Sequence, residues 1–180
     1  MIEIRIHGRG GQGSVTMAEL LAEAAFYGGK FVQAFPNFGV ERRGAPVVAY
    51  VRIDDKFIRR RSQVYAPDYI IVQDSSLIGT TPVFEGAKDD SIILINTRQS
   101  ITSLSLPKGL KIKTINANGL ALELLGKPII NTILLGAFAS LSGLIELSGV
   151  EKAIRERFNP ELAEKNVLAA KKGFKIISNN

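Results

Sequence analysis

The chain has 180 residues, and among them there is no cysteine, no tryptophan and only one histidine, His7. Without cysteine, the chain cannot itself supply a disulfide, a zinc–thiolate site, a ligand to an iron–sulfur cluster or a thiol nucleophile. The absence of cysteine suits a reducing compartment, and the first residues lack the charged and apolar regions of a signal peptide. We therefore expect a cytoplasmic protein.

The chain also lacks an uninterrupted apolar run of the length that crosses a membrane. Its most apolar stretch, residues 129–147, is interrupted by Asn131, Thr132, Ser140, Ser142 and Glu146. A membrane-spanning helix needs about 20 mostly apolar residues in succession, so this stretch indicates a buried helix instead. No internal repeat or long linker divides the sequence, which predicts a single domain over residues 1–180.

The formal net charge of +6 suits an acidic partner protein, a phosphorylated ligand or nucleic acid. Basic residues gather at positions 59–61 and 171–172. No set of aromatic side chains for base stacking accompanies these runs, so we expect no nucleic-acid partner.

Apolar periodicity and turn residues predict strands that alternate with helices. The expected strands cover residues 2–6, 30–35, 45–53, 57–61, 69–72, 91–96 and 110–116, and the expected helices cover 15–25, 119–125, 130–144, 150–158 and 161–173. Residues 45–53 and 57–61 flank a turn and predict an antiparallel hairpin. The expected fold class is α/β, a three-layer α/β/α domain with a mixed, mostly parallel sheet that includes this hairpin.

A glycine-rich loop follows the first expected strand, with Gly8, Arg9, Gly10, Gly11, Gln12 and Gly13 before a helix that Ser14 would cap. Free backbone N–H groups at a helix start favour anionic oxygen. The spacing matches the dinucleotide pattern G-x-G-x-x-G, but residues 30–34 lack the carboxylate that would hold the ribose hydroxyls. No P-loop motif is present either. Two interpretations stay open, a loop that contacts a phosphate or a partner, and a tight turn that binds nothing.

A second candidate loop, residues 36–44, follows the second expected strand and contains Glu41, Arg42, Arg43 and Gly44. If the two strands run parallel, both loops lie at the same sheet edge, where ligand crevices form. Glu41 and Arg42 could pair with one another, and Arg43 could bind a carboxylate or phosphate. A plain surface loop with a local ion pair is the alternative.

The remaining polar residues favour structural roles. Asp74, Ser75 and Ser76 resemble a helix N-cap, and Asn131 and Asn166 suit a cap or a packed polar contact. A lone histidine beside a loop, such as His7, is more often a hydrogen-bonded structural residue than a catalyst. No paired carboxylates, metal-ligand cluster or activated nucleophile stands out, so we assign no catalytic or metal-binding residue.

The run Gly8–Gly13 together with residues 38–46, Phe-Gly-Val-Glu-Arg-Arg-Gly-Ala-Pro, resembles the gamma subunit of pyruvate:ferredoxin oxidoreductase and related 2-oxoacid:ferredoxin oxidoreductases. The resemblance covers nearly the whole chain and includes Asn131, residues 135–137 and residues 166–173. The resemblance is closest to the enzymes that act on pyruvate, although these residues do not decide which 2-oxoacid is the substrate.

The resemblance implies a subunit of a complex that converts a 2-oxoacid and coenzyme A to acyl-CoA, carbon dioxide and reduced ferredoxin. It implies partner alpha, beta and delta subunits, with ferredoxin as the electron acceptor. Thiamine diphosphate with Mg²⁺ and the [4Fe-4S] clusters would belong to those partners, and this chain would be inactive alone. Gly8 to Gly13 would face coenzyme A phosphates or another subunit, and Glu41, Arg42, Arg43 and Gly44 would form a second contact. The alternative is a stand-alone Rossmann-like nucleotide-binding protein.

Overall fold

The computed structural model describes residues 1–37, 43–104, 106–107 and 109–179. Its strands are β1 (Ile2–Arg9), β2 (Phe31–Asn37), β3 (Pro46–Asp54), β4 (Tyr69–Val72), β5 (Ile92–Asn96) and β6 (Lys111–Ile115). Its α-helices are α1 (Ser14–Tyr27), α2 (Ala117–Leu125), α3 (Asn131–Ser142), α4 (Leu147–Arg157) and α5 (Pro160–Ser178), with short 3-10 helices at Ser75–Leu77 and Ile101–Ser103.

The strands form one mixed sheet in the order β2-β3-β1-β4-β5-β6. β1, β4, β5 and β6 are parallel, while β3 runs antiparallel to both β1 and β2. The expected α/β class with a mixed, mostly parallel sheet is confirmed. Because β1 and β2 both run opposite to β3, their carboxyl ends lie at the same edge of the sheet.

The expected hairpin partner is wrong, because residues 57–61 form no strand and β3 pairs with β2 instead. Both edges of β3 are already occupied, by β1 and β2, so residues 57–61 have no free edge of β3 to pair with. Arg52 in β3, whose side chain is completely buried, binds the segment that follows. Its guanidinium donates to the backbone carbonyls of Arg60 (3.4 Å), Ser62 (2.7 Å) and Gln63 (3.2 Å). A side chain of β3 thus binds the carbonyls of residues 60, 62 and 63, in a segment that forms no strand of its own.

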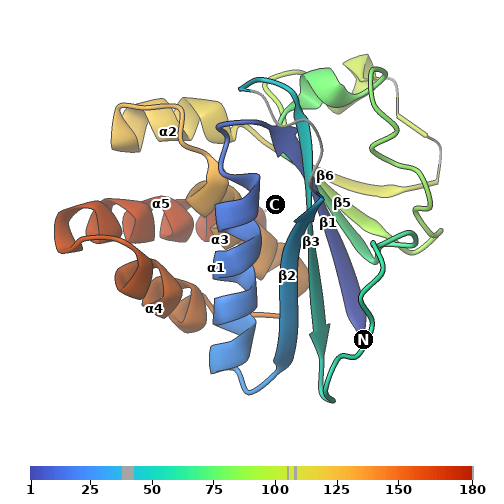
Figure 1. Cartoon of the computed structure of the whole chain (residues 1–180). Coiled ribbons are helices and arrows are strands. Elements are labelled where there is room, and N and C mark those ends of the chain that lie inside the picture. The colour runs from blue at the N-terminus through green and yellow to red at the C-terminus, as the bar shows by residue number, and fades with distance from the viewer. Residues whose placement is uncertain (38–42, 105, 108, 180) are drawn as a thin grey trace.

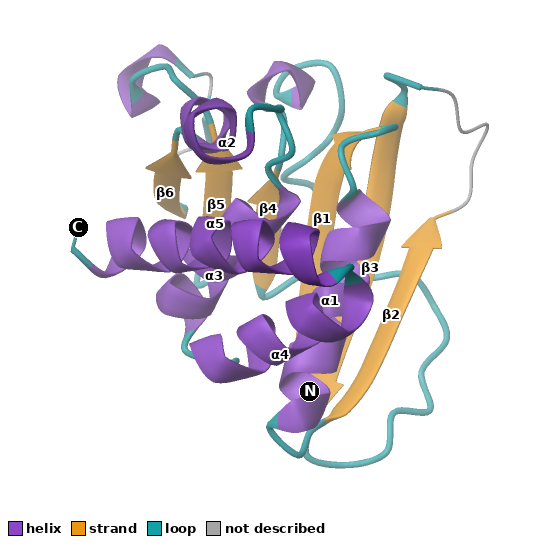
Figure 2. Ribbon diagram, turned by 90° about the vertical axis from the view of Figure 1, so that its left-hand side faces the viewer, coloured by secondary structure: helices purple, strands orange, loops and turns teal. Residues whose placement is uncertain are grey.

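The α-helices of the described residues lie together on one face of the sheet (Figures 1 and 2). The main core is built there, from alternate strand residues such as Ile4 and Ile6 against α1, α3 and α5. On the opposite face, irregular segments and the 3-10 helix Ser75–Leu77 pack through a smaller apolar cluster that includes Ile70, Val72 and Leu77. The expected third layer is present, but it contains no α-helix in the described part of the chain.

The helix expected at residues 130–144 is α3, which is buried along most of its length. Its backbone crosses α5 closely, since a Cβ on Gly136 would lie 1.9 Å from the Ala170 carbonyl oxygen. Thr132 Oγ1 donates to Asn166 Oδ1 at 2.8 Å across this crossing, so the packed polar role expected of Asn166 is confirmed. Among the described residues, no helix combines the length and the apolar character needed to cross a membrane.

Candidate functional site

The glycine-rich loop joins the carboxyl end of β1 to the start of α1 as a tight turn. Gln12 N–H donates to the Arg9 carbonyl at 3.0 Å, and Gln12 Oε1 accepts from Arg9 N–H at 2.8 Å. Gly13 has a φ of 76°, a left-handed conformation that glycine adopts without a Cβ penalty. The Gln12 side chain thus closes the loop, and Gly13 permits the left-handed turn into the helix.

The amino end of α1 has no side-chain cap. The N-cap residue is Gly13, so the capping role expected of Ser14 is wrong. Ser14 Oγ instead donates to Gln73 Oε1 at 2.6 Å in the interior, because the hydroxyl points toward β4. The first turn contains no acidic residue. These backbone N–H groups and the helix dipole favour an external anion.

A hollow of about 300 Å³ lies in front of this helix end. Its lining includes Gly10, Gly11, Gly13 and the first turn of α1 at residues 14–16. The loop glycines leave the backbone uncovered by side chains, so a ligand oxygen can approach the N–H groups. The arrangement suits binding of a phosphate or carboxylate.

The two candidate loops meet, as expected from their common sheet edge. Gly10 N–H donates to the Ala45 carbonyl at 2.8 Å, and Gly44 N–H donates to the Gly10 carbonyl at 3.1 Å. Arg43 lies beside Gly11, with its Cγ 3.9 Å from the position of a Cβ built there. Glu41 and Arg42, the other charged residues predicted for this site, lie outside the described residues.

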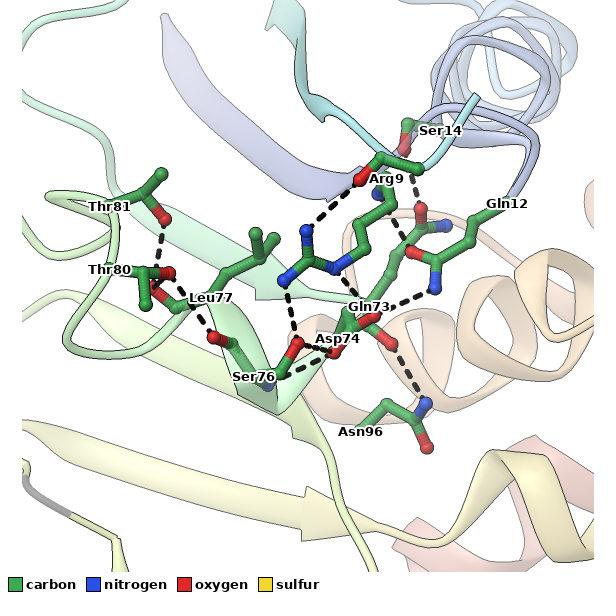
Figure 3. Close-up of polar contacts among 11 residues, drawn as sticks. Arg9, Gln12, Ser14, Gln73, Asp74, Ser76, Leu77, Thr80, Thr81 and Asn96 are labelled. Carbon is green, nitrogen blue, oxygen red and sulfur yellow. Dashed lines mark hydrogen bonds and ion pairs between the residues drawn. The ribbon is translucent and has the colours of Figure 1, made fainter. Parts of the chain in front are cut away.

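Arg9 and Gln12 are held by neighbouring side chains in the site (Figure 3). Arg9 Nε lies 3.1 Å from Asp74 Oδ2, and its other nitrogens donate to Ser76 Oγ at 2.8 Å and the Gly44 carbonyl at 3.0 Å. Gln12 Nε2 also donates to Asp74 Oδ2, at 3.0 Å. Arg9 therefore positions the loops. Arg43 is the exposed cation that stays available, since it makes no hydrogen bond or ion pair within the described ranges.

The carboxylate of Asp74 is stabilised in its ionised form. Burial alone raises its pKa, but hydrogen bonds from Ser76 and Gln12 and the charge of Arg9 outweigh this and lower the pKa overall. Asp74 also accepts from Ser76 N–H at 3.0 Å, so its expected N-cap role is confirmed, at a 3-10 helix. This ionised group gives Arg9 a permanent partner.

Sequence reasoning missed that Gln73 and Asn96 link this edge to its neighbours. Asn96 Nδ2 donates to the Gln73 carbonyl at 2.8 Å (Figure 3). Asn96 Oδ1 accepts from Ala117 N–H at 2.9 Å. With Arg98 and Asn118 these residues line a second hollow of about 230 Å³. Their positions in the sequence could have indicated this role. Gln73 follows β4 and Asn96 ends β5, and the polar residues at the carboxyl ends of parallel strands meet at one edge of the sheet.

Comparisons with known proteins agree with the resemblance in the sequence. A model of the pyruvate ferredoxin/flavodoxin oxidoreductase family matches residues 3–176. Pyruvate synthase subunit PorC of Methanocaldococcus jannaschii is 56% identical over 170 residues, which cover 94% of this chain and 93% of that protein. The common gamma subunit of the pyruvate/ketoisovalerate oxidoreductases of Thermococcus kodakarensis is 53% identical over 178 residues, covering 97% and 96%.

A solved structure supports the fold independently. The crystal structure of the pyruvate oxidoreductase subunit PORC from Thermotoga maritima matches with a TM-score of 0.86 at 36% identity. The match covers 97% of this chain and 95% of that chain. The family model, the relatives and the shared fold span almost the whole sequence, and we conclude that this chain belongs to the pyruvate ferredoxin/flavodoxin oxidoreductase family.

Proposed function

We propose that the chain is the gamma subunit of a pyruvate:ferredoxin oxidoreductase that acts in the cytoplasm with alpha, beta and delta subunits. The support is its similarity to gamma subunits over nearly its full length. The complex would convert pyruvate and coenzyme A to acetyl-CoA and carbon dioxide and would reduce ferredoxin. The Thermococcus relative is described as common to two oxidoreductases, which suggests that substrate choice lies in other subunits.

The residues of this chain do not fit the redox cofactors of such a complex. The sequence has no cysteine for an iron–sulfur cluster. The described residues also contain no group of three or more histidine, aspartate or glutamate side chains placed to hold a metal ion. The [4Fe-4S] clusters would therefore be held by the partner subunits. We assign thiamine diphosphate with its Mg²⁺ to those subunits as well, on the resemblance to gamma subunits, so the isolated chain would have no activity.

Within the complex, the amino end of α1 would bind a phosphate of coenzyme A. The observation that carries this proposal is the uncapped first turn, which faces the 300 Å³ hollow. Arg43 lies beside Gly11, one of the residues that line this hollow. A phosphate there would accept from the backbone N–H groups of α1 and from the Arg43 guanidinium. Gly8 to Gly13 and residues 41–44 form the binding loops in this assignment. An acidic side chain from another subunit is the competing occupant.

A stand-alone nucleotide-binding enzyme is the second candidate function. It is favoured only by the strand–glycine loop–helix geometry around Gly8, Gly10 and Gly13. β2 and the residue before it contain no carboxylate to hold ribose hydroxyls. The isolated chain should therefore show no binding of NAD or ATP by calorimetry.

Purification of the tagged chain from its host without oxygen tests the assignment to a complex. We expect larger chains to copurify, with the brown absorption of iron–sulfur clusters and with coenzyme A-dependent reduction of ferredoxin by pyruvate. A colourless chain recovered alone would refute the subunit proposal.

Arg43→Ala in the assembled complex tests the coenzyme A contact. One charge-assisted hydrogen bond contributes about 1.5–3 kcal/mol, so we expect the KM for coenzyme A to rise roughly tenfold or more while the KM for pyruvate stays unchanged. Arg43→Lys should recover part of the loss, and Arg59→Ala, at another exposed arginine, serves as the control. An unchanged KM in a complete complex argues against the contact, whereas failed assembly favours a subunit-facing loop.

A further inference from the structure

A cavity of about 450 Å³ lies on the sheet face opposite the α-helices. β1 directs Ile4 and Ile6 into the helical core, so the alternate residues Arg5 and His7 face the other way and line this cavity. Irregular segments around Tyr65 and Glu85 complete its walls. The volume lies in the range of small-molecule sites, which is about 300–1,000 Å³.

Arg5 is a buried cation with no carboxylate partner. The residue is only 6% exposed. Its terminal nitrogens donate to the backbone carbonyls of Val64 (3.5 Å), Val83 (3.2 Å) and Glu85 (2.5 Å). Its Nε is buried and has no partner among the described residues. The Glu85 carboxylate is exposed and acts on Arg5 only through longer-range attraction.

Arg52, on the same face of the sheet, shows what a satisfied buried arginine looks like in this protein. Its Nε lies 2.7 Å from Glu3 Oε1 in a buried ion pair. Buried charges in proteins are normally paired in this way, because an uncompensated charge in the interior is costly. Arg5 is also buried and lines a cavity, but its counter-charge is missing from the described part of the chain.

His7 has the second unpartnered nitrogen at this cavity. The residue is 7% exposed, and its Nε2 has no hydrogen-bond partner within the described ranges. Burial, and then the charge of Arg5, lowers the pKa of His7 to about 3, so the imidazole is neutral at physiological pH. The other titratable side chains that line the cavity are Arg5, Tyr50, Tyr65 and Glu85. An anion would accept from Arg5 Nε–H, and from His7 Nε2 in the tautomer that carries its proton there.

We propose that this cavity is a binding site for a small monocarboxylate with an apolar body, whose carboxylate lies against Arg5 and His7. The apolar part would contact Val48, Leu77 and Pro82, which also line the cavity. A single negative charge fits best, because the site offers one cation and Glu85 opposes a second anionic charge. The proposal concerns a different face from the glycine-rich loop and does not depend on the coenzyme A contact.

His7 provides a clean test, because it is the only histidine in the chain. We would label histidine with ¹⁵N and follow the imidazole signals of the full-length chain by NMR during titration with benzoate. Benzamide, which has the same shape without the charge, is the matched control. We expect saturable shifts with benzoate, binding roughly 10- to 100-fold weaker for benzamide, and a rise in the His7 pKa with benzoate because a nearby anion favours the imidazolium. Equal binding of both compounds, or binding of neither, would overturn the proposal.

Variants locate the site. Arg5→Met should abolish the benzoate shifts, while Arg59→Met, at an exposed arginine, and Arg43→Ala, at the other candidate site, should leave them unchanged. Benzoate binding that survives in Arg5→Met refutes the assignment. If Arg5→Met does not fold, the comparison of benzoate with benzamide on the natural sequence still decides.

The carboxylate could be a free metabolite or a side chain of a partner subunit. The same titration on the assembled oxidoreductase distinguishes these sources. Benzoate binding that persists in the complex assigns the cavity to a free carboxylate. Binding that is present in the isolated chain and lost on assembly assigns it to an aspartate or glutamate of a partner.

Discussion

Substitution of Gly13 by alanine combines two separable effects at the start of α1. An alanine at φ 76° would adopt the left-handed conformation, which costs about 1–2 kcal/mol. Its Cβ would also lie 2.7 Å from Asn131 Nδ2, whereas ordinary contact begins at 3.4 Å. Asn131 cannot move freely, because its Oδ1 accepts from Thr132 N–H at 3.0 Å in the first turn of α3. Overpacking of this kind adds about 1–3 kcal/mol.

Gly29→Ala is the matched control, because Gly29 has a φ of 78° and a Cβ there would meet nothing within 4 Å. Its loss of unfolding free energy should equal the backbone contribution alone. We therefore expect Gly13→Ala to lose about 1–3 kcal/mol more than Gly29→Ala in urea unfolding with unchanged m-values. For a chain of this size the difference corresponds to roughly 2–12 °C in Tm.

The functional readout of Gly13→Ala is the KM for coenzyme A in the assembled complex. Either Asn131 or the amino end of α1 must move, so the KM should rise for Gly13→Ala and stay unchanged for Gly29→Ala. Equal stability losses in the two variants would refute the inference that contact with Asn131 constrains the loop. A changed stability with an unchanged KM would instead argue against a ligand at this helix end.

Two further predictions concern buried ionisable side chains on the sheet face opposite the α-helices. Glu3→Gln leaves the Arg52 guanidinium without its carboxylate and should reduce the free energy of unfolding by about 3–5 kcal/mol, far more than Glu161→Gln in an exposed pair; similar losses in urea would contradict this. His7 binds a proton in the unfolded chain near pH 6.5 but in the folded protein only near its lowered pKa of about 3. Stability therefore falls as the pH drops from about 6.5 toward 3, and His7→Leu should remove at most about 5 kcal/mol of this fall, as measured by urea unfolding at several pH values. Parallel stability–pH curves for the two proteins would show that His7 is not held neutral.

Much of the fold could be predicted locally. The strands at 69–72, 91–96 and 110–116 and the terminal helices were expected within a few residues of their observed bounds, because apolar periodicity and flanking turn residues mark them. The glycine-rich loop was likewise recognised from its position between a strand and a helix. The failures were residues 57–61 and the role of Ser14. Residues 57–61 found no free edge of β3, because β1 and β2 pair on its two sides, and Ser14 bonds to Gln73, which lies 59 residues further along the chain.

The sequence by itself determined the class of the protein, the two candidate loops and the absence of thiol chemistry. Each of these depends on residue type and short-range spacing. Only the tertiary structure decided that Arg9 is bound by Asp74, which leaves Arg43 as an exposed cation beside the loop, and that β1 and β2 occupy both edges of β3. It also revealed Arg5 and His7 as unpartnered groups around a cavity. The physical reason is that the partner of a charged or polar side chain is chosen by packing between segments about 50 to 80 residues apart, and local spacing carries no information about such distances.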